Sequence, residues 1–250
     1  MIEEILPAEV AAIDAVDEDL ADLFAAERAA IGGAVPERRR EFAMVRKSAR
    51  TALGQLGIPP VPLVPGAGRA PVWPTGVVGS MTHCPGYRAA AVARSSRVHA
   101  VGIDAEVSEP LPSGVLQMIG LPSERAMLAR LDEQHPEVPW DRLLFSCKES
   151  VYKIWYPLAG SMLEFDGAEV EIDPGGCFSA RFTVEGPVAA GHRVSHLSGR
   201  WLHRDGLLLT GIALGMINLP GISLRPDDHS PRLQLAVSSG ELTGSSLGWN

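Results

Sequence analysis

The chain has few of the residues that mark secreted or thiolate-metal proteins. Its 250 residues include only three cysteines, Cys84, Cys147 and Cys177, which are too few and too scattered for a disulfide framework or a thiolate metal site. No stretch approaches the ~18 apolar residues of a membrane span, and the acidic start lacks the basic and apolar regions of a signal peptide. We therefore expect a cytoplasmic protein that does not insert into a membrane.

The chain also lacks an excess of positive charge. It has 22 Lys and Arg residues against 30 Asp and Glu residues, a net charge of −8, whereas nucleic-acid binding usually needs a broad basic surface. Nucleic acid is therefore not expected as a partner. One segment reverses this balance, because residues 36–50 hold six basic and two acidic side chains. A single basic patch on an acidic protein indicates a small polyanion or an acidic protein surface as its partner.

The pattern of apolar residues predicts a mixture of helices and strands. The hydrophobic content of 46% is typical of a soluble globular protein, and the length allows one large core or two lobes. Proline and glycine crowd residues 57–79 and predict an irregular but ordered loop. The expected helices span residues 36–56, 123–131 and 140–155, with helical character also at 19–30. The expected strands span residues 77–82, 89–93, 101–107, 168–172, 178–184 and 201–214, the last with a hairpin turn at Asp205-Gly206.

The segment Val101-Gly102-Ile103-Asp104-Ala105-Glu106 alternates apolar and other residues, which is typical of a half-buried strand. Asp104 and Glu106 therefore project from the same face, roughly 7 Å apart. Two carboxylates facing a cleft at that distance repel each other unless they share a proton or a cation. A hard divalent ion would satisfy both, although such a pair can also belong to a solvated strand face.

The segment Phe145-Ser146-Cys147-Lys148-Glu149-Ser150-Val151-Tyr152-Lys153 lies on the second long helix. Placed beside the strand, Glu149 would supply a third oxygen ligand, while Lys148 and Lys153 would bring positive charge to a bound anion. Mg²⁺ fits this pattern, because it binds one or two carboxylates and completes its shell with water and phosphate oxygens. The alternative is an ordinary Glu149–Lys153 helix pair, worth about 0.3–0.5 kcal/mol.

Together these two segments resemble the signature motifs of the 4′-phosphopantetheinyl transferases, in the branch that includes the siderophore-type and actinobacterial enzymes. The resemblance extends through residues 79–90 and 38–46 and covers most of residues 36–214. It implies an α+β fold of two similar lobes in pseudo-twofold arrangement, with the active site between them. We expect the lobes to span residues 1–100 and 101–214, followed by a Gly/Ser/Pro-rich extension over 215–250.

The resemblance also implies a reaction: transfer of 4′-phosphopantetheine from coenzyme A to a serine of an apo carrier protein, with release of adenosine 3′,5′-bisphosphate. The implied metal is Mg²⁺, with Mn²⁺ as a substitute, and the partners are acyl or peptidyl carriers of fatty acid, polyketide, nonribosomal peptide or siderophore synthesis. A monomer is expected, because two lobes in one chain complete the cleft. The implied metal ligands are Asp104, Glu106 and Glu149; the catalytic residues are Glu149, Lys153 and Lys148; the coenzyme A contacts are Arg38, Arg46, Thr82, His83, Asp104, Lys148 and Lys153.

Several alternatives stay open at this point. Lys148 can bind phosphate or pair structurally with a nearby acid, and Glu149 can take the serine proton directly or through a metal-bound water. Relatives often carry a basic residue near the loop that contains Arg69, but its register differs, so Arg69 is left out of the expected site. Other functions for the chain are a Mg²⁺-dependent phosphohydrolase and a non-catalytic module that binds coenzyme A or carriers. Such a module should have lost at least one of the five acidic and basic motif residues, all of which are present.

Overall fold

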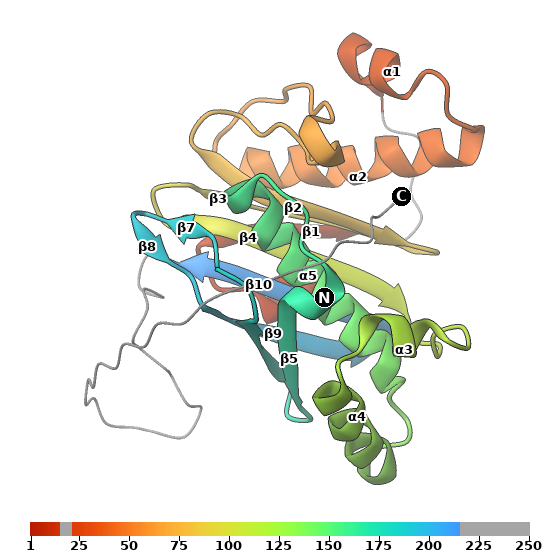
Figure 1. The fold of residues 1–250 in the computed structure, drawn as a ribbon. Helices are drawn as coiled ribbons and strands as arrows, with labels where there is room; N and C mark the ends of the chain where they lie inside the picture. The colour runs from red at the N-terminus through yellow and green to blue at the C-terminus, as the bar shows by residue number, and fades with distance from the viewer. Residues whose placement is uncertain (16–21, 216–250) are drawn as a thin grey trace.

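The computed structural model describes residues 1–15 and 22–215. It is an α+β protein with antiparallel sheets, as expected, and two long helices lie on the outer faces of two sheets (Figure 1). None of the helices within the described residues is long and apolar enough to cross a membrane.

The first half of the chain forms a three-stranded sheet with the order β1-β3-β2. Its strands are β1 (Val10–Ala15), β2 (Val77–Cys84) and β3 (Tyr87–Arg94), preceded by a short 3₁₀ turn, η1 (Ile2–Ile5). Helix α2 (Pro36–Gln55) packs on one face of this sheet, after the short α1 (Ala25–Ile31). The proline at the first position of α2 suits a helix start, because its missing N–H has no partner there.

The second half forms a five-stranded sheet with the order β4-β10-β9-β6-β5. Its long helix α5 (Trp140–Ala159) packs mainly on β4 and β10, and a tight hairpin at Asp205-Gly206 joins β9 to β10 as predicted. The strands are β4 (Val98–Val107), β5 (Ala168–Asp173), β6 (Cys177–Phe182), β9 (His196–Arg204) and β10 (Leu207–Gly215). Smaller elements are η2 (Ala67–Arg69), α3 (Val115–Ile119), α4 (Pro122–Gln134), η3 (Phe165–Gly167), β7 (Val188–Ala189) and β8 (His192–Arg193).

The buried apolar side chains fall into three layers, and the middle one joins the two halves. Strand alternation explains the layers: Ala90 and Val92 of β3 face α2, whereas Ala89 and Ala91 face the second sheet. Val101, Ile103, Leu207 and Leu209 meet that second set, so the inner faces of the two sheets share one core. The third layer lies between α5 and the outer face of the five-stranded sheet.

The sequence-based elements are confirmed with a few differences. Strand β1 was not predicted; its sequence is rich in alanine, which is uncommon in strands. The N-cap positions of α4 and α5 are Leu121 and Pro139. The predicted boundary at residues 100 and 101 falls inside β4. The predicted C-terminal extension lies outside the described residues except for its first residue.

Candidate active site

Strand β4 and helix α5 approach each other closely at Gly102. A Cβ atom at this glycine would lie 2.2 Å from the carbonyl oxygen of Ser150, so only glycine allows the helix backbone to come this near. The next residue on the same face of β4 is Asp104. The close approach therefore brings the side chains of α5 within reach of that carboxylate.

Asp104 is almost fully buried and accepts hydrogen bonds from three side chains. Lys153 Nζ donates to Oδ1 at 2.7 Å and Ser146 Oγ donates to Oδ2 at 2.9 Å, both from α5. Thr82 Oγ1 of β2 donates to Oδ1 at 3.2 Å. The predicted residues Asp104, Lys153 and Thr82 thus meet at one point, where the two sheets adjoin.

Glu106 lies two residues farther along β4 and is paired with Arg142 at the start of α5. The distance from Arg142 Nη1 to Glu106 Oε2 is 2.9 Å, and the same guanidinium donates to the carbonyl oxygens of Glu109 and Pro110. Burial raises the pKa of Glu106, with a further contribution from Asp104, while Arg142 opposes the shift.

Glu149 faces the same region from α5 and lines a small cavity with Tyr152 and Phe165. Burial raises the pKa of its carboxyl to about 7; Lys153 opposes this shift, while Asp104 and Glu106 add to it. Carboxylates that influence each other in this way are close enough for mutual repulsion. Glu149 is therefore able to hold or release a proton near neutral pH.

The three acidic residues form the donor set that a hard divalent cation prefers. All are oxygen ligands, and a cation between them would offset both the burial of Glu106 and Glu149, which is the main cause of their raised pKa values, and the repulsion among the acids that adds to it. They are not gathered into a ready cage, since the described residues contain no group of three His, Cys, Asp or Glu side chains placed to hold a metal. Asp104 and Glu106 instead form ion pairs with Lys153 and Arg142, respectively. The metal site stays a prediction that these residues fit chemically.

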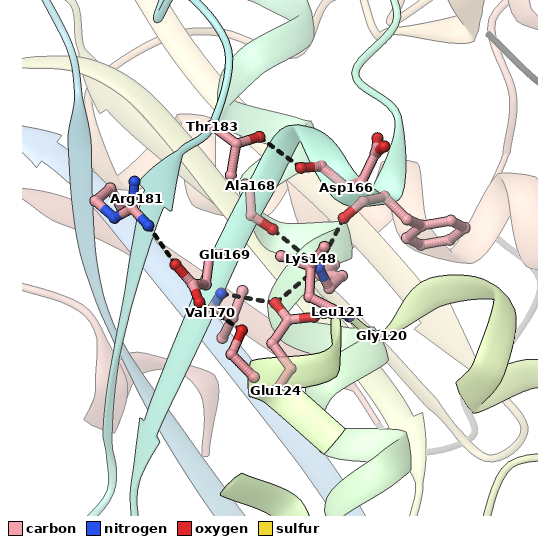
Figure 2. Close-up of polar contacts among 12 residues, drawn as sticks. Gly120, Leu121, Glu124, Lys148, Asp166, Ala168, Glu169, Val170, Arg181 and Thr183 are labelled. Atoms are coloured by element: carbon pink, nitrogen blue, oxygen red, sulfur yellow. Dashed lines mark hydrogen bonds and ion pairs between the residues drawn. The ribbon is translucent and has the colours of Figure 1, made fainter. Parts of the chain in front are cut away.

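Lys148 is held by an acidic side chain and by backbone carbonyl oxygens (Figure 2). Its Nζ lies 2.8 Å from Oε1 of Glu124 and donates to the carbonyl oxygens of Phe165 and Ala168 at 2.7 and 2.9 Å. An ammonium group has three donors, and these three contacts use all of them. Both side chains of the pair are nearly inaccessible to solvent. The geometry thus favours the structural alternative for Lys148, and we leave it out of the proposed site.

The remaining predicted residues line one cavity of about 580 Å³ beside α2 and β2. This volume is within the range of about 300–1,000 Å³ that is usual for small-ligand sites. Its walls include the predicted Arg38, Arg46, Thr82 and His83, together with Arg69 from the proline-rich loop. Because Thr82 also donates to Asp104, the cavity adjoins the acidic cluster.

Two arginines of α2 contribute to this cavity in different ways. Arg46 is buried: its Nε donates to the Leu63 carbonyl oxygen at 2.7 Å, and its guanidinium carbon lies 3.1 Å from the centre of the Phe42 ring. Burial lowers the pKa of Arg46 to about 10. Arg38 is half exposed, with its Nη1 2.7 Å from His83 Nε2. Arg38 is therefore the more available of the two for an anion.

A glutamate shares this end of the cavity with Arg38 and His83. Glu41 Oε2 lies 3.2 Å from Arg38 Nη1 and 3.3 Å from His83 Nε2. Burial lowers the pKa of His83, which Glu41 opposes and Arg38 reinforces. The imidazole therefore favours its neutral form, in which Nε2 can accept the hydrogen bond from Arg38.

The structure adds Glu41, Arg142 and Ser146 to the predicted residues of this region, and Arg69, which had been considered and left out of the expected site, also lines the cavity. Helix spacing could have found three of them. Ser146 and Lys153 are two turns apart on one face of α5, as are Arg142 and Glu149, and Glu41 is one turn from Arg38. Arg69 comes from an irregular loop, for which no periodicity exists.

A cavity with basic walls beside a cluster of carboxylates suits an enzyme that acts on a phosphate-bearing substrate. Comparison with known families identifies the class. The 4′-phosphopantetheinyl transferase N-terminal domain matches residues 26–93, and the 4′-phosphopantetheinyl transferase superfamily model matches residues 100–207. The two matches cover the cavity and the acidic cluster respectively.

Individual relatives agree with the family matches. The 4′-phosphopantetheinyl transferase Svp of Streptomyces mobaraensis is 54% identical over 219 residues, covering 86% of this chain and 89% of the relative. The transferase PptT of Mycobacterium tuberculosis is 44% identical, over 74% of this chain and 82% of its own length. Npt of Nocardia iowensis is 45% identical, over 85% and 99%. The chain belongs to the 4′-phosphopantetheinyl transferase superfamily, whose reaction moves phosphopantetheine from coenzyme A to carrier proteins.

Proposed function

We propose that this chain performs the family reaction where the cavity meets the acidic cluster, with its own residues in the roles described below. The observation that supports this most is the position of Thr82, which lines the cavity and donates to Asp104. Because Thr82 lies between the cavity and Asp104, a ligand bound in the cavity would have its pyrophosphate beside the carboxylates.

The basic cavity would hold the nucleotide end of coenzyme A. The guanidinium of Arg38 suits phosphate oxygens because its donors match them in pairs. His83 lies beside it, and Arg46 forms the wall and adds positive charge from below the surface. Asp104, Glu106 and Glu149 would hold Mg²⁺, or Mn²⁺ in its place, which supplies neutralising charge to the pyrophosphate when bound.

Glu149 is the proposed proton acceptor. In the reaction the serine oxygen of the carrier bonds to phosphorus, the phosphoanhydride bond breaks, and adenosine 3′,5′-bisphosphate leaves with the bonding electron pair. The serine proton would pass to Glu149. Burial raises the pKa of this carboxyl to about 7 before a cation binds, and a bound Mg²⁺ would lower it. Lys153, held by Asp104 at 2.7 Å, is placed to stabilise charge on the leaving phosphate.

We propose acyl or peptidyl carrier proteins as the acceptors, and a monomer in the cytoplasm as the working form. The support for the monomer is that one chain supplies both the cavity and the carboxylates. Gel filtration with light scattering tests this part, and a mass of twice 26.6 kDa would contradict it.

The activity is tested by incubating the protein with coenzyme A, Mg²⁺ and an apo acyl carrier protein, and then weighing the intact carrier. A mass gain of one phosphopantetheine group supports the proposal. Release of bisphosphate without any change in the carrier would support the hydrolase, and binding without either product would support the non-catalytic module. Glu149→Gln should abolish transfer, whereas Glu133→Gln, a matched change at an exposed position on α4, should leave it unchanged.

A further inference from the structure

The loop between α2 and β2 folds into a compact turn over residues 64–72. The backbone N–H of Val72 donates to the carbonyl oxygen of Val64 at 2.9 Å, and that of Gly66 donates to Ala70 at 2.7 Å. At the tip, Gly68 and Arg69 both have left-handed backbones, with φ of 57° and 62°. A left-handed arginine is uncommon and persists only where the surroundings hold it.

The tip of this loop packs against helix α5, which carries Glu149 and Lys153. A Cβ atom on Gly68 would lie 2.2 Å from both Cζ and Oη of Tyr156, so the tyrosine ring rests directly against the glycine backbone. Tyr156 follows Lys153 by one helical turn on α5. The Tyr156 ring is itself backed by Tyr152, with ring centres 5.8 Å apart.

This contact joins the two parts of the proposed site. Arg69, adjacent to Gly68, lines the same cavity as Arg38 and His83. Tyr156 belongs to the helix that carries Glu149 and Lys153, in the half of the chain matched by the second family model. A change at Tyr156 would therefore act on the cavity, although Tyr156 is not among the residues that line it.

We propose that Tyr156 is a positioning residue, which holds the 64–72 loop so that Arg69 contributes its charge to the coenzyme A cavity. The proposal rests on the proposed function, in that it takes the cavity to bind the nucleotide end of coenzyme A. It assigns Tyr156 no contact with substrate. Tyr156 affects coenzyme A binding only by fixing the position of Arg69.

The test combines Tyr156→Ala, Arg69→Ala and the double variant in steady-state transfer assays with coenzyme A. Loss of one charge-assisted phosphate contact should raise the KM for coenzyme A on the order of tenfold in each single variant, with kcat within about twofold. The double variant should be no worse than Arg69→Ala, because Tyr156 acts only through that residue. Tyr156→Phe retains the ring against Gly68 and should behave as the unchanged protein.

Two outcomes would overturn the proposal. One is a double variant whose increase in KM for coenzyme A equals the product of the two single increases. The other is a fall in the kcat of Tyr156→Ala with its KM unchanged. Thermal melting of each variant shows whether a loss of fold is the cause. Should Tyr156→Ala fail to fold, Gly68→Ala places a methyl group against the ring and is expected to raise KM in the same way; an unchanged KM there would also overturn it.

Calorimetric titration with adenosine 3′,5′-bisphosphate separates this proposal from the proposed function. Weakened binding in Tyr156→Ala, but not in Tyr156→Phe, supports the positioning role even if no carrier is modified. Absence of transfer by the unchanged protein would count against the proposed function alone. Equal bisphosphate affinity in all variants would count against the positioning role alone.

Discussion

Replacing Lys148 by methionine should destabilise the protein without removing its chemistry. The change leaves the Glu124 carboxylate buried with two backbone N–H donors, those of Leu121 and Val170, but without its cation. Breaking a buried ion pair by removing one partner typically costs about 3–5 kcal/mol. For a chain of this size, each kcal/mol corresponds to roughly 2–4 °C, so we expect a fall in the melting temperature on the order of 10 °C.

The assay compares thermal melting and transfer rate at a temperature well below the transition. Lys148→Met should melt lower than the unchanged protein yet retain most of its kcat, because the ammonium group points toward the start of α4 and the η3–β5 junction (Figure 2). Adding Glu124→Gln should recover part of the loss, since no unpaired charge then stays buried. A normal melting temperature combined with a hundredfold loss of kcat would refute this reasoning and place Lys148 among the phosphate ligands.

Three further predictions concern charge in the site. Burial raises the pKa of Glu149 from 4.5 to about 7, because the buried carboxyl is more stable when protonated. The stability that the protonated carboxyl contributes is fully present below pH 4.5 and is lost as the pH rises through 7. In thermal melting, Glu149→Gln should therefore have a higher Tm than the unchanged protein at pH 8 and the same Tm at pH 4. Glu41→Gln frees Arg38 from its internal carboxylate and should tighten adenosine 3′,5′-bisphosphate binding several-fold in calorimetry; weaker binding would contradict it. Mg²⁺ held by the acidic cluster would neutralise charge on the pyrophosphate, so removal of Mg²⁺ with a chelator should weaken coenzyme A binding in calorimetry; an unchanged affinity would contradict this prediction.

The two charged motifs were predictable because their spacing alone fixes which side chains share a face. Alternation along β4 puts Asp104 and Glu106 together, and the helical repeat puts Glu149 near Lys153, before any tertiary contact is known. The position of Gly102 is also informative, because a glycine inside a strand often marks a close backbone approach.

The roles of Lys148 and Arg46 depend on partners that the local sequence does not reveal. Lys148 forms an ion pair with Glu124, 24 positions earlier in the chain, and Arg46 donates a hydrogen bond to the Leu63 carbonyl oxygen. Neither partner is fixed by helix or strand periodicity, so a buried and an exposed cation look alike in the sequence. Strand β1 was missed for a similar reason, since pairing with β3 rather than its alanine-rich sequence makes it a strand.

The pairing of charges also explains how a chain with a net charge of −8 can bind a polyanion. Two cations near the proposed phosphate positions already have an acidic partner: Glu41 for Arg38, and Asp104 for Lys153. These pairs hold the cations in place before a substrate arrives, which lowers the entropy cost of binding. The same acids compete with phosphate for the cations, so they weaken binding of the product as well as of the substrate. For an enzyme whose product is a bisphosphate, that competition favours product release and turnover over tight binding.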